Sequence, residues 1–280
     1  MKTTEQNSNY DNLEKMPTRG LLEGINREDH VVADAVQKTL PQLEKLVDGI
    51  VARVREGGRI FYMGAGTSGR LGVVDASEIP PTYGVRDLFI GLIAGGPGAM
   101  FNAVEGAEDD PDGAWKDLQP WNPSSKDTLV GIAASGTTPY VLGGIRKARA
   151  EGLLTACITC NSEAPVADAA EIPIIAVVGP EFVTGSTRMK AATAQKMILN
   201  MISTATMIRL GRVKGNKMYD MQLSNAKLVD RGTRMIMEAS GLDYEKAKAA
   251  LLKYGSVRAA VQELAFTPLP PRTGSLKKLP

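Results

Sequence analysis

The sequence predicts an α/β protein: a three-layer α/β/α sandwich with a mainly parallel sheet, followed by a small C-terminal helical appendix. Short apolar segments alternate with segments of helical periodicity from residue 59 to residue 211. The apolar segments are continuous and do not alternate with polar residues. Such strands are typical of a parallel sheet that helices cover on both faces. The 280 residues suffice for one large domain and a small addition.

The first expected element is an amphipathic helix over residues 29–55, where apolar side chains recur at intervals of three and four. Pro41 kinks or breaks this helix, and Gly57 and Gly58 end it. Strands are then expected over 59–66, 86–96, 127–136, 153–160 and 171–179. Helices are expected over 69–79, 97–110, 138–152 and 186–211, the last of them capped at or near Ser186.

The chain is expected to divide into four parts. Residues 1–12 are polar and are predicted to be disordered, and residues 13–217 form the α/β domain with its N-terminal helices. The character of the sequence changes at residue 218, and residues 218–265 predict a small helical domain with two short helices around Gly255. The proline-rich residues 266–280 are predicted to be a disordered tail.

The composition argues against several classes of function. A net charge of +2 without clustered basic residues predicts no nucleic-acid partner. No apolar run reaches 18 residues, and the polar N-terminus lacks the pattern of a signal peptide, so we expect a cytoplasmic protein with no membrane partner. His30 is the only histidine and has no partner motif, which argues against a histidine-dependent hydrolase and against a metal site.

Cys157 and Cys160 form a C-x-x-C pattern inside an apolar, β-branched segment. A redox pair requires a helix N-terminus that stabilises the thiolate, and this segment predicts a strand. A zinc site requires four ligands, and the sequence offers no second pair of cysteines. Packing in the core is therefore the better interpretation.

A glycine pattern, G-x-G-x-x-G, occurs at Gly64, Gly66 and Gly69, directly after the first strand. A dinucleotide site also needs an acidic residue at the end of the second strand, and that strand ends in "LIAGG". Asp87 stands at its beginning. The glycine pattern therefore does not predict a dinucleotide cofactor.

Two loops of the same design predict a phosphate site instead. Both follow a strand, open a helix and carry hydroxyl groups, and these hydroxyls belong to Thr67, Ser68, Ser135, Thr137 and Thr138. Backbone N–H groups and the helix dipole at such positions favour a compact anion. A simpler alternative is that these residues only form turns and caps. Because both loops lie in matching positions, we favour the phosphate site.

The loops and their surroundings resemble a known family. The segments "GAGTSGRLG" and "IAASGTTPYV" resemble SIS-domain phosphosugar binders. The longer strings "GAGTSGRLGVVDASEIPPTYGV" and "TGSTRMKAATAQKMILNMIST" resemble the N-acetylmuramic acid 6-phosphate etherase family, from about residue 13 to about residue 260. The resemblance implies the SIS fold, a homodimer, and an enzyme that uses neither a metal nor an organic cofactor.

The resemblance also implies a carbon–oxygen lyase. The family removes D-lactate from N-acetylmuramic acid 6-phosphate, leaves N-acetylglucosamine 6-phosphate and serves peptidoglycan recycling and amino sugar catabolism. Direct displacement of an alkoxide is difficult, but ring opening gives an aldehyde at C1 that acidifies the C2 proton. Elimination then needs a base at C2 and an acid at the lactate oxygen on C3. With one unpromising histidine, carboxyl groups are the natural candidates.

The family's two catalytic glutamates map onto Glu78 and Glu108, and Glu105 is the neighbour that could be confused with Glu108. We assign Glu78 as the acid that protonates the lactate oxygen and Glu108 as the base at C2. The opposite assignment of the two roles is an open alternative.

Further residues are expected around the substrate. Ser186 and Thr187, near the start of the long helix, are expected to complete the phosphate pocket. Lys190 either aids substrate charge or ring opening, or serves as a helix cap or on a dimer face. The methionines of "MKAATAQKMILNM" stand at helical spacing, which indicates core or dimer interface and not a metal site.

Two other functions use the same kind of cradle. A non-catalytic phosphosugar-binding regulator often carries a DNA-binding domain, and no helix-turn-helix pattern precedes this one. An aldose–ketose phosphosugar isomerase would share the cradle and a carboxylate base. Release of D-lactate separates the three functions.

Overall fold

The chain forms two compact units in a computed structural model that describes residues 2–266. The first unit comprises the residues up to Ile79 together with Val85–Gly211, and the second comprises Pro80–Gly84 together with the residues from Arg212 onward. The sequence predicted one boundary near residue 217 and did not anticipate that residues 80–84 join the C-terminal unit. The tail predicted from residue 266 lies, beyond that residue, outside the described part of the chain.

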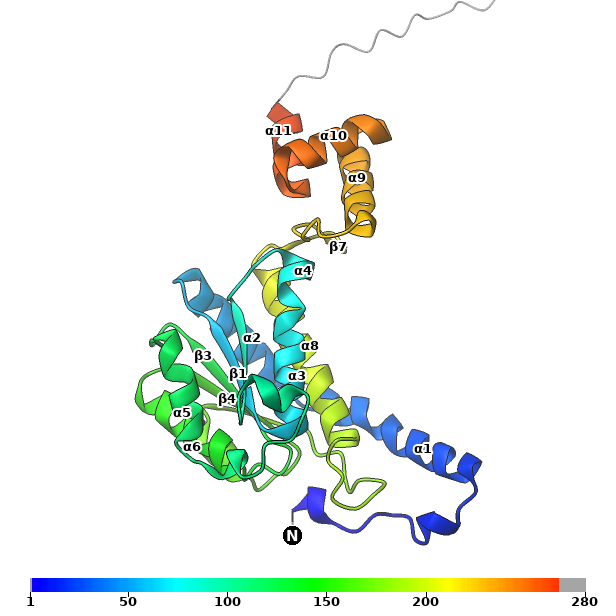
Figure 1. The fold of residues 1–280 in the computed structure, drawn as a ribbon, viewed down its shortest axis with the longest axis vertical. Coiled ribbons are helices and arrows are strands. Elements are labelled where there is room, and N and C mark those ends of the chain that lie inside the picture. Colours follow the sequence, from blue (N-terminus) through cyan, green and yellow to red (C-terminus); the bar gives the residue numbers. More distant parts are fainter. Residues whose placement is uncertain (1, 267–280) are drawn as a thin grey trace, which may run out of the picture. The chain divides into compact units, whose positions relative to one another are not determined.

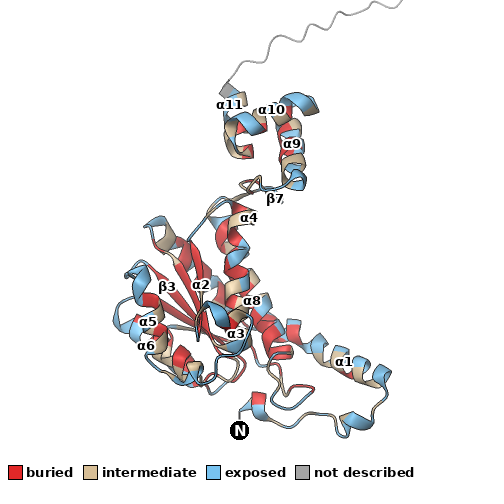
Figure 2. Cartoon of the chain, in the orientation of Figure 1, coloured by how far each residue is buried: buried red, intermediate tan, exposed pale blue. Residues whose placement is uncertain are grey.

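A five-stranded parallel sheet forms the centre of the first unit (Figure 1). Its strands are β1 (Ile60–Gly64), β2 (Phe89–Ile93), β3 (Thr128–Ile132), β4 (Leu154–Thr159) and β5 (Ile172–Ile175). They lie in the order β2-β1-β3-β4-β5, and each neighbouring pair is parallel. Every residue of β1, β3 and β4 is buried (Figure 2), which confirms that continuous apolar runs mark the interior strands.

Helices cover both faces of this sheet and confirm the three-layer α/β/α sandwich. One face carries α2 (Leu40–Arg55), α3 (Gly66–Ser77) and α8 (Lys190–Arg209), and α1 (Thr18–Gln37) packs on α8. The other face carries α5 (Gly113–Leu118), α6 (Pro139–Ala150) and α7 (Pro165–Ala169).

The expected helices agree with the structure in one case and differ in another. The helix over residues 29–55 is broken next to Pro41, as expected: α1 ends at Gln37, and Pro41 lies in the first turn of α2, where its missing N–H is tolerated. The helix expected over 97–110 is wrong, because this segment holds only the 3₁₀ turns η3 (Pro97–Met100) and η4 (Ala107–Asp109). Gly106 adopts a φ of 73° between them, which an α-helix excludes.

Residues 2–12, for which the sequence predicted disorder, are part of the first unit and form contacts within it. Thr3–Glu5 form the turn η1, and Leu13–Lys15 form η2. The backbone N–H of Thr4 donates to the side chain of Asn161, 157 residues further along the chain. The structure therefore differs from the expectation here, since polar composition carries no information about a partner so distant in sequence.

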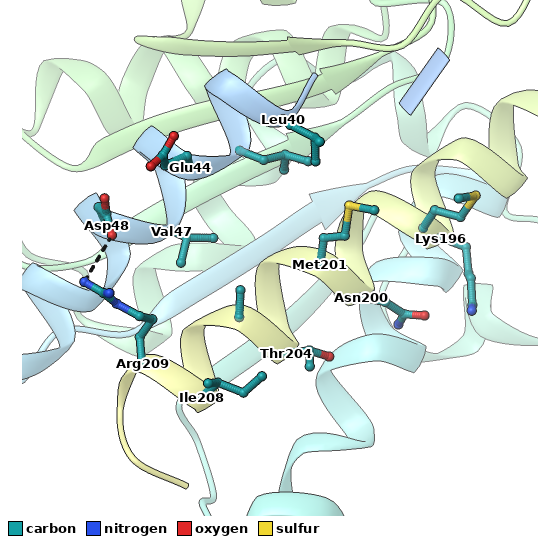
Figure 3. A pocket seen from close by; sticks show the side chains of 13 residues that line it. Leu40, Glu44, Val47, Asp48, Lys196, Asn200, Met201, Thr204, Ile208 and Arg209 are labelled. Atoms are coloured by element: carbon teal, nitrogen blue, oxygen red, sulfur yellow. Dashed lines mark ion pairs between the residues drawn. The ribbon is translucent and has the colours of Figure 1, made fainter. Parts of the chain in front are cut away.

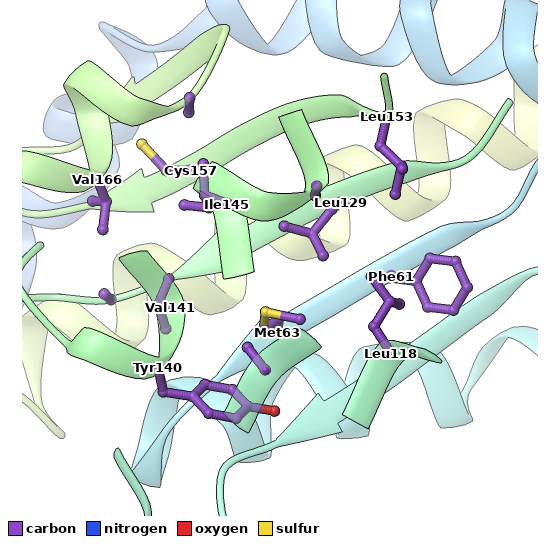
Figure 4. Packing of buried hydrophobic residues seen from close by; sticks show 14 of the residues in the cluster. Phe61, Met63, Leu118, Leu129, Tyr140, Val141, Ile145, Leu153, Cys157 and Val166 are labelled. Atoms are coloured by element: carbon purple, nitrogen blue, oxygen red, sulfur yellow. The ribbon is translucent and has the colours of Figure 1, made fainter. Parts of the chain in front are cut away.

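A cluster of buried apolar side chains fills the space between the sheet and α5, α6 and α7 (Figure 4). Cys157 of β4 lies in this cluster near Ile145 and Val166, and Cys160 follows directly after the strand. Both cysteines are free and buried. Burial raises the pKa of each thiol to about 12, so neither is a thiolate at neutral pH. The interpretation of this pair as core packing is confirmed.

The second unit is a small helical domain with its own core. It contains the short strands β6 (Val213–Lys214) and β7 (Lys217–Met218), and the helices α9 (Ala226–Ser240), α10 (Tyr244–Tyr254) and α11 (Val257–Phe266). Asn225 and Asp243 cap the N-termini of α9 and α10 with side-chain hydrogen bonds, as the residue types at such positions predict. The helix α4 (Ile79–Tyr83) leads into this unit, where Pro81 accepts a hydrogen bond from the backbone of Gln222.

Candidate functional site

The site lies at the carboxyl ends of β1 and β3, which are neighbours in the sheet. The chain proceeds from β1 to β2 in one direction and from β3 to β4 in the other. Ligands of open parallel sheets bind at such a reversal, because the loops that follow the two strands diverge and leave a crevice. The two glycine-rich segments of the sequence are the loops that follow β1 and β3.

The first loop turns sharply from β1 into α3, and its glycines are needed for that turn. A Cβ atom at Gly64 would stand 2.7 Å from the backbone N of Gly69, and a Cβ at Gly69 would stand 2.6 Å from the backbone O of Gly64. Gly66 opens α3 with a φ of 51°. Thr67 and Ser68 therefore fall in the first turn of α3, where backbone N–H groups have no intrahelical acceptor.

The second loop joins β3 to α6 and has the same design. Gly136 adopts a φ of 71°, and a Cβ there would stand 2.3 Å from the Cβ of Ala164. The hydroxyls of Ser135 and Thr137 lie 3.2 Å apart, within hydrogen-bonding distance. Pro139 occupies the first turn of α6, as the sequence predicted.

A cavity of about 400 Å³ lies between the two loops, a volume within the usual range of small-molecule sites. It brings together seven residues that the sequence singled out: Thr67, Ser68, Glu108, Ser135, Thr137, Thr138 and Thr187. Two helices, α3 and α6, begin at its wall. Their N-terminal N–H groups and dipoles favour a negatively charged group in this cavity.

The ionisable residues that line the cavity are acidic. They are Glu5, Glu108 and Asp109, and the described lining includes no lysine or arginine. A phosphate there would meet hydroxyls and backbone N–H groups together with these carboxylates. Acidic groups near such a ligand suit proton transfer better than anion binding.

A second cavity of about 310 Å³ adjoins the first, and Glu108 and Asp109 line both. Glu105, the neighbour that could be confused with Glu108, lines only this second cavity. Arg70 lines it as well, and its Nε donates to the backbone O of Met100 at 3.0 Å. The geometry therefore distinguishes Glu108 from Glu105, since Glu108 borders the space between the two loops.

Glu78 does not line either cavity. It is exposed and follows the last residue of α3, twelve positions beyond Gly66. A helical rise of 1.5 Å per residue places it about 18 Å from the loop along the helix axis. Within one copy of the chain, the two glutamates of the proposed pair are therefore not brought together.

Lys190 and Ser186 also lie outside the cavity lining, although Gly185 and Thr187 border it. Lys190 is only 2% exposed and forms an ion pair with Glu28 of α1. Burial raises the pKa of Glu28, but the hydrogen bond and charge of Lys190 outweigh it and lower the pKa overall. The ion pair gives Lys190 a structural role between α8 and α1.

The N-terminus of α8 is capped by Glu181 and not by Ser186. The buried carboxylate of Glu181 accepts hydrogen bonds from the backbone N atoms of Lys190 and Ala191 at 3.0 and 2.9 Å. A cap at Ser186, the expected position, would have been a hydroxyl from a residue next to the start of the helix. A carboxylate from outside the helix satisfies the same free N–H groups and favours the positive end of the dipole.

Two residues that sequence analysis missed hold the loops in place. Gln195 of α8 is buried and accepts a hydrogen bond of 2.9 Å from the hydroxyl of Ser68. The side-chain N of Asn161, also buried, donates to the backbone O atoms of Ala134 and Ser135 at 3.3 and 3.0 Å. A buried amide in an apolar helix or after a strand is the signal that could have identified both.

Within the described residues, no three His, Cys, Asp or Glu side chains lie together in a way that could hold a metal ion. Over the same part of the chain, no helix combines the length and the apolar character that a membrane crossing requires.

Solved structures from bacteria share this fold. The TM-score is 0.52 with an Escherichia coli protein, at 15% identity over 72% of this chain and 97% of that chain. It is 0.51 with phosphoheptose isomerase from Neisseria gonorrhoeae, at 12% identity over 68% of this chain and 99% of that chain. Residues 112–205 match the SIS domain family, and residues 42–149 match the glucokinase regulatory protein N-terminal SIS domain family. The fold and the site thus define a SIS-domain protein.

Close relatives specify the family within this class. The chain is 65% identical to an N-acetylmuramic acid 6-phosphate etherase of Christiangramia forsetii, over 91% of this chain and 93% of the relative. Identity is 63% with the protein of that name from Bacteroides thetaiotaomicron, over 94% and 95%. It is 60% with the one from Porphyromonas gingivalis, over 95% and 98%. The chain belongs to the N-acetylmuramic acid 6-phosphate etherase family.

Proposed function

We propose that this chain cleaves the lactyl ether of N-acetylmuramic acid 6-phosphate and gives N-acetylglucosamine 6-phosphate and D-lactate. The observation that carries the proposal is the cavity in which two hydroxyl-rich loops meet Glu108 at the switch point of the sheet. The names of the relatives support the substrate. The enzyme is a carbon–oxygen lyase of the cytoplasm that serves peptidoglycan recycling and amino sugar catabolism.

The substrate's phosphate occupies the space between the two loops. The Thr67 hydroxyl and the backbone N–H of Ser68 approach it from the start of α3, and hydroxyls from Ser135, Thr137 and Thr138 approach it from the start of α6. The two helix N-termini add backbone N–H donors and positive dipole ends. Binding through the phosphate leaves the sugar carbons to extend toward the acidic side of the cavity.

The reaction is an elimination followed by a hydration. Opening of the sugar ring gives an aldehyde at C1, and Glu108 removes the C2 proton. The C3–O bond breaks, the lactate oxygen receives a proton, and a double bond forms between C2 and C3. Water then adds its oxygen to C3 while a proton returns to C2, which restores the saturated sugar. General acid–base catalysis of this kind contributes roughly 10²–10⁴-fold to the rate.

The proton for the lactate oxygen comes from Glu78 of a second copy of the chain, so the active form is a homodimer. Glu78 is exposed, and the length of α3 separates it from the cavity of its own copy. A second copy that places this end of α3 beside the cavity completes the acid–base pair. In this proposal, the dimer supplies the general acid that a single copy lacks at its cavity.

An apolar groove along α2 and α8 supports such a dimer (Figure 3). It has a volume of about 880 Å³ and is lined by Leu40, Met201 and Ile208, which are 46%, 37% and 49% exposed. Large apolar side chains gathered in one groove are typical of an interface between subunits. Asn200 lines the same groove and donates to Asp75 of α3, so the groove adjoins the helix that leads to Glu78.

The test is to incubate the purified protein with N-acetylmuramic acid 6-phosphate and to measure D-lactate. The proposal expects equal amounts of D-lactate and N-acetylglucosamine 6-phosphate. An aldose–ketose isomerase would change the sugar without releasing lactate. A regulator would bind the phosphosugar without turnover. Either outcome would replace the proposed function.

A further inference from the structure

The N-terminal segment Lys2–Ser8, here called the N-terminal strap, lies at the edge of the cavity. Glu5 lines the cavity, and Lys2 Nζ donates a hydrogen bond of 2.8 Å to the hydroxyl of Thr137. Thr137 belongs to the loop between β3 and α6, 135 positions further along the chain. We propose that Lys2 binds the phosphate of the ligand together with Thr137, and that the N-terminal strap is a wall of the binding site.

The strap is held against the phosphate loop by Asn161. The backbone N of Thr4 donates to Asn161 Oδ1 at 3.1 Å, and Asn161 Nδ2 donates to the Thr4 hydroxyl at 3.0 Å. The same Asn161 amide donates to the backbone O atoms of Ala134 and Ser135. One buried side chain therefore joins the strap to the loop that carries the hydroxyls.

The other end of the strap is fixed as well. The Ser8 hydroxyl donates to the backbone O of Phe182 at 2.7 Å, and the Ser8 backbone N donates to the Thr184 hydroxyl at 2.9 Å. The rings of Tyr10 and Phe182 pack with their centroids 4.7 Å apart. With anchors at Thr4 and Ser8, the position of Lys2 beside the loop follows from the fold and does not depend on a free chain end.

Charge explains what Lys2 contributes. The described residues that line the cavity include three carboxylates, those of Glu5, Glu108 and Asp109, and no cation. A phosphate dianion brought among them meets repulsion that neutral hydroxyls do not cancel. Lys2 supplies an ammonium group beside Thr137, and hydrogen bonds between an ammonium and a phosphate are about twice as strong as neutral ones.

The geometry also leaves Lys2 able to change partners. Its side chain is exposed, and the group it contacts is a neutral hydroxyl. When a phosphate binds at the loop, the charged oxygen is the stronger acceptor, and the ammonium reaches it while Thr137 turns its own hydroxyl to the ligand. This inference takes one point from the proposed function, namely that the ligand is a sugar phosphate.

The experiment measures binding of N-acetylglucosamine 6-phosphate by calorimetry, with untagged protein so that residue 2 keeps its surroundings. Lys2→Ala is expected to raise the Kd about tenfold, and Lys2→Glu more, because a charge-assisted hydrogen bond to the ligand is lost. Lys2→Arg retains the charge and should stay within about threefold of the parent. Lys15→Ala, an exposed lysine that pairs with Glu14, is the matched control.

Two further readouts separate a phosphate contact from a general structural effect. The salt dependence of the Kd should be weaker in Lys2→Ala than in the parent, since one ionic contact is gone. In the lactate assay, the KM should rise with the Kd while kcat stays within about twofold, because uniform binding has been removed. Thr4→Val removes the hydrogen bond between Asn161 and the Thr4 hydroxyl without changing Lys2 itself, and it should also raise the Kd.

The outcomes distinguish this inference from the proposed function. Unchanged Kd and KM in Lys2→Ala and Lys2→Glu would overturn the inference and leave the etherase proposal intact. A fall in kcat at unchanged KM would also overturn it, since Lys2 would then act on the chemical step. If the parent releases no lactate but binds the sugar phosphate in a Lys2-dependent manner, the proposed function fails and the inference holds.

Discussion

The hydroxyl of Ser68 donates a hydrogen bond of 2.9 Å to Oε1 of Gln195, so the helix α8 holds the first turn of α3. Ser68 lines the cavity, whereas Gln195 is 1% exposed and does not line it. Gln195 is therefore a positioning residue for the phosphate loop. The link explains why a polar side chain occupies a buried position in the long helix.

Replacement of Gln195 tests this relationship. Gln195→Ala removes the acceptor, and we expect a loss of about 1–3 kcal/mol in the free energy of unfolding. Because the first turn of α3 then loses its anchor on α8, the Kd for N-acetylglucosamine 6-phosphate should rise severalfold while the pH profile of kcat stays unchanged. Thr193→Ala, an exposed position on the same helix, is the control for both measurements. An unaltered Kd in a folded Gln195→Ala protein would contradict the positioning role.

If Glu78 and Glu108 act from different copies of the chain, two inactive variants should restore activity to each other when they are co-expressed. Glu78→Gln and Glu108→Gln should each lose lactate release and still bind N-acetylglucosamine 6-phosphate. Each mixed dimer would contain one site with both changes and one site with neither. Random pairing makes half of the dimers mixed, so co-expression should restore about a quarter of the parental activity.

A site formed within one copy of the chain predicts a different result of the co-expression experiment. If both glutamates acted within one copy, every site in every dimer would carry one change, and co-expression would restore nothing. Glu105→Gln is the control variant, since Glu105 lies only in the adjoining cavity and should leave activity near the parental level. A loss of activity in Glu105→Gln comparable with that in Glu108→Gln would reopen the assignment of the base.

The ion pair between Lys190 and Glu28 predicts a pH dependence of stability. The pKa of Glu28 is lowered from 4.5 in the folded protein, so its contribution is present above the unfolded value and is lost as the pH falls through the folded value. Glu28→Gln leaves Lys190 buried without its charged partner and should cost about 3 kcal/mol at pH 7. Denaturant unfolding should show the variant and the parent converging as the pH falls through the lowered pKa of Glu28.

The matched control for that measurement is Glu23→Gln, which removes an exposed pair with Arg19 on the same helix. Surface pairs of this kind contribute about 0–1 kcal/mol. If Glu28→Gln cost no more than Glu23→Gln at pH 7, Lys190 would not depend on Glu28, and a role for Lys190 at the substrate would regain support.

Isotopes from water test the elimination and hydration. In ¹⁸O water, the proposed route places the new oxygen at C3 of N-acetylglucosamine 6-phosphate and leaves lactate unlabelled. In deuterated water, solvent deuterium should appear at C2, because the C2 proton passes to a carboxylate and is replaced. Mass spectrometry of both products reads out both labels. Label in the lactate, or none at C2, would rule out this route.

Much of the fold could be predicted because its signals are local. The buried strands β1, β3 and β4 appear as continuous apolar runs, and Pro139 marks the start of α6. The wrong helix prediction also has a physical reason. The segment 97–110 has apolar spacing like a helix, but Gly106 adopts a positive φ that interrupts it. Spacing alone does not reveal that conformation.

The loops of the site could be predicted from the sequence, but the residues that hold these loops in place could not. Thr67 and Thr137 follow glycine-rich turns, which are visible in the sequence. The supports act through contacts that are distant in the chain: Gln195 is 127 residues from Ser68, and Asn161 is 26 residues from Ser135. The same distance conceals the strap at Lys2, since a polar segment predicts disorder until its partners are placed. Composition carries no information about such partners.

The most direct test of the proposed site is a crystal structure with N-acetylglucosamine 6-phosphate bound. We expect the phosphate between the loops, within hydrogen-bonding distance of the Ser68 backbone N, the Thr137 hydroxyl and the ammonium group of Lys2. We further expect Glu108 beside C2, with Glu78 of another copy beside C3. A phosphate bound outside the cavity at the ends of β1 and β3, or a Glu108 carboxylate turned away from C2, would contradict the proposed site.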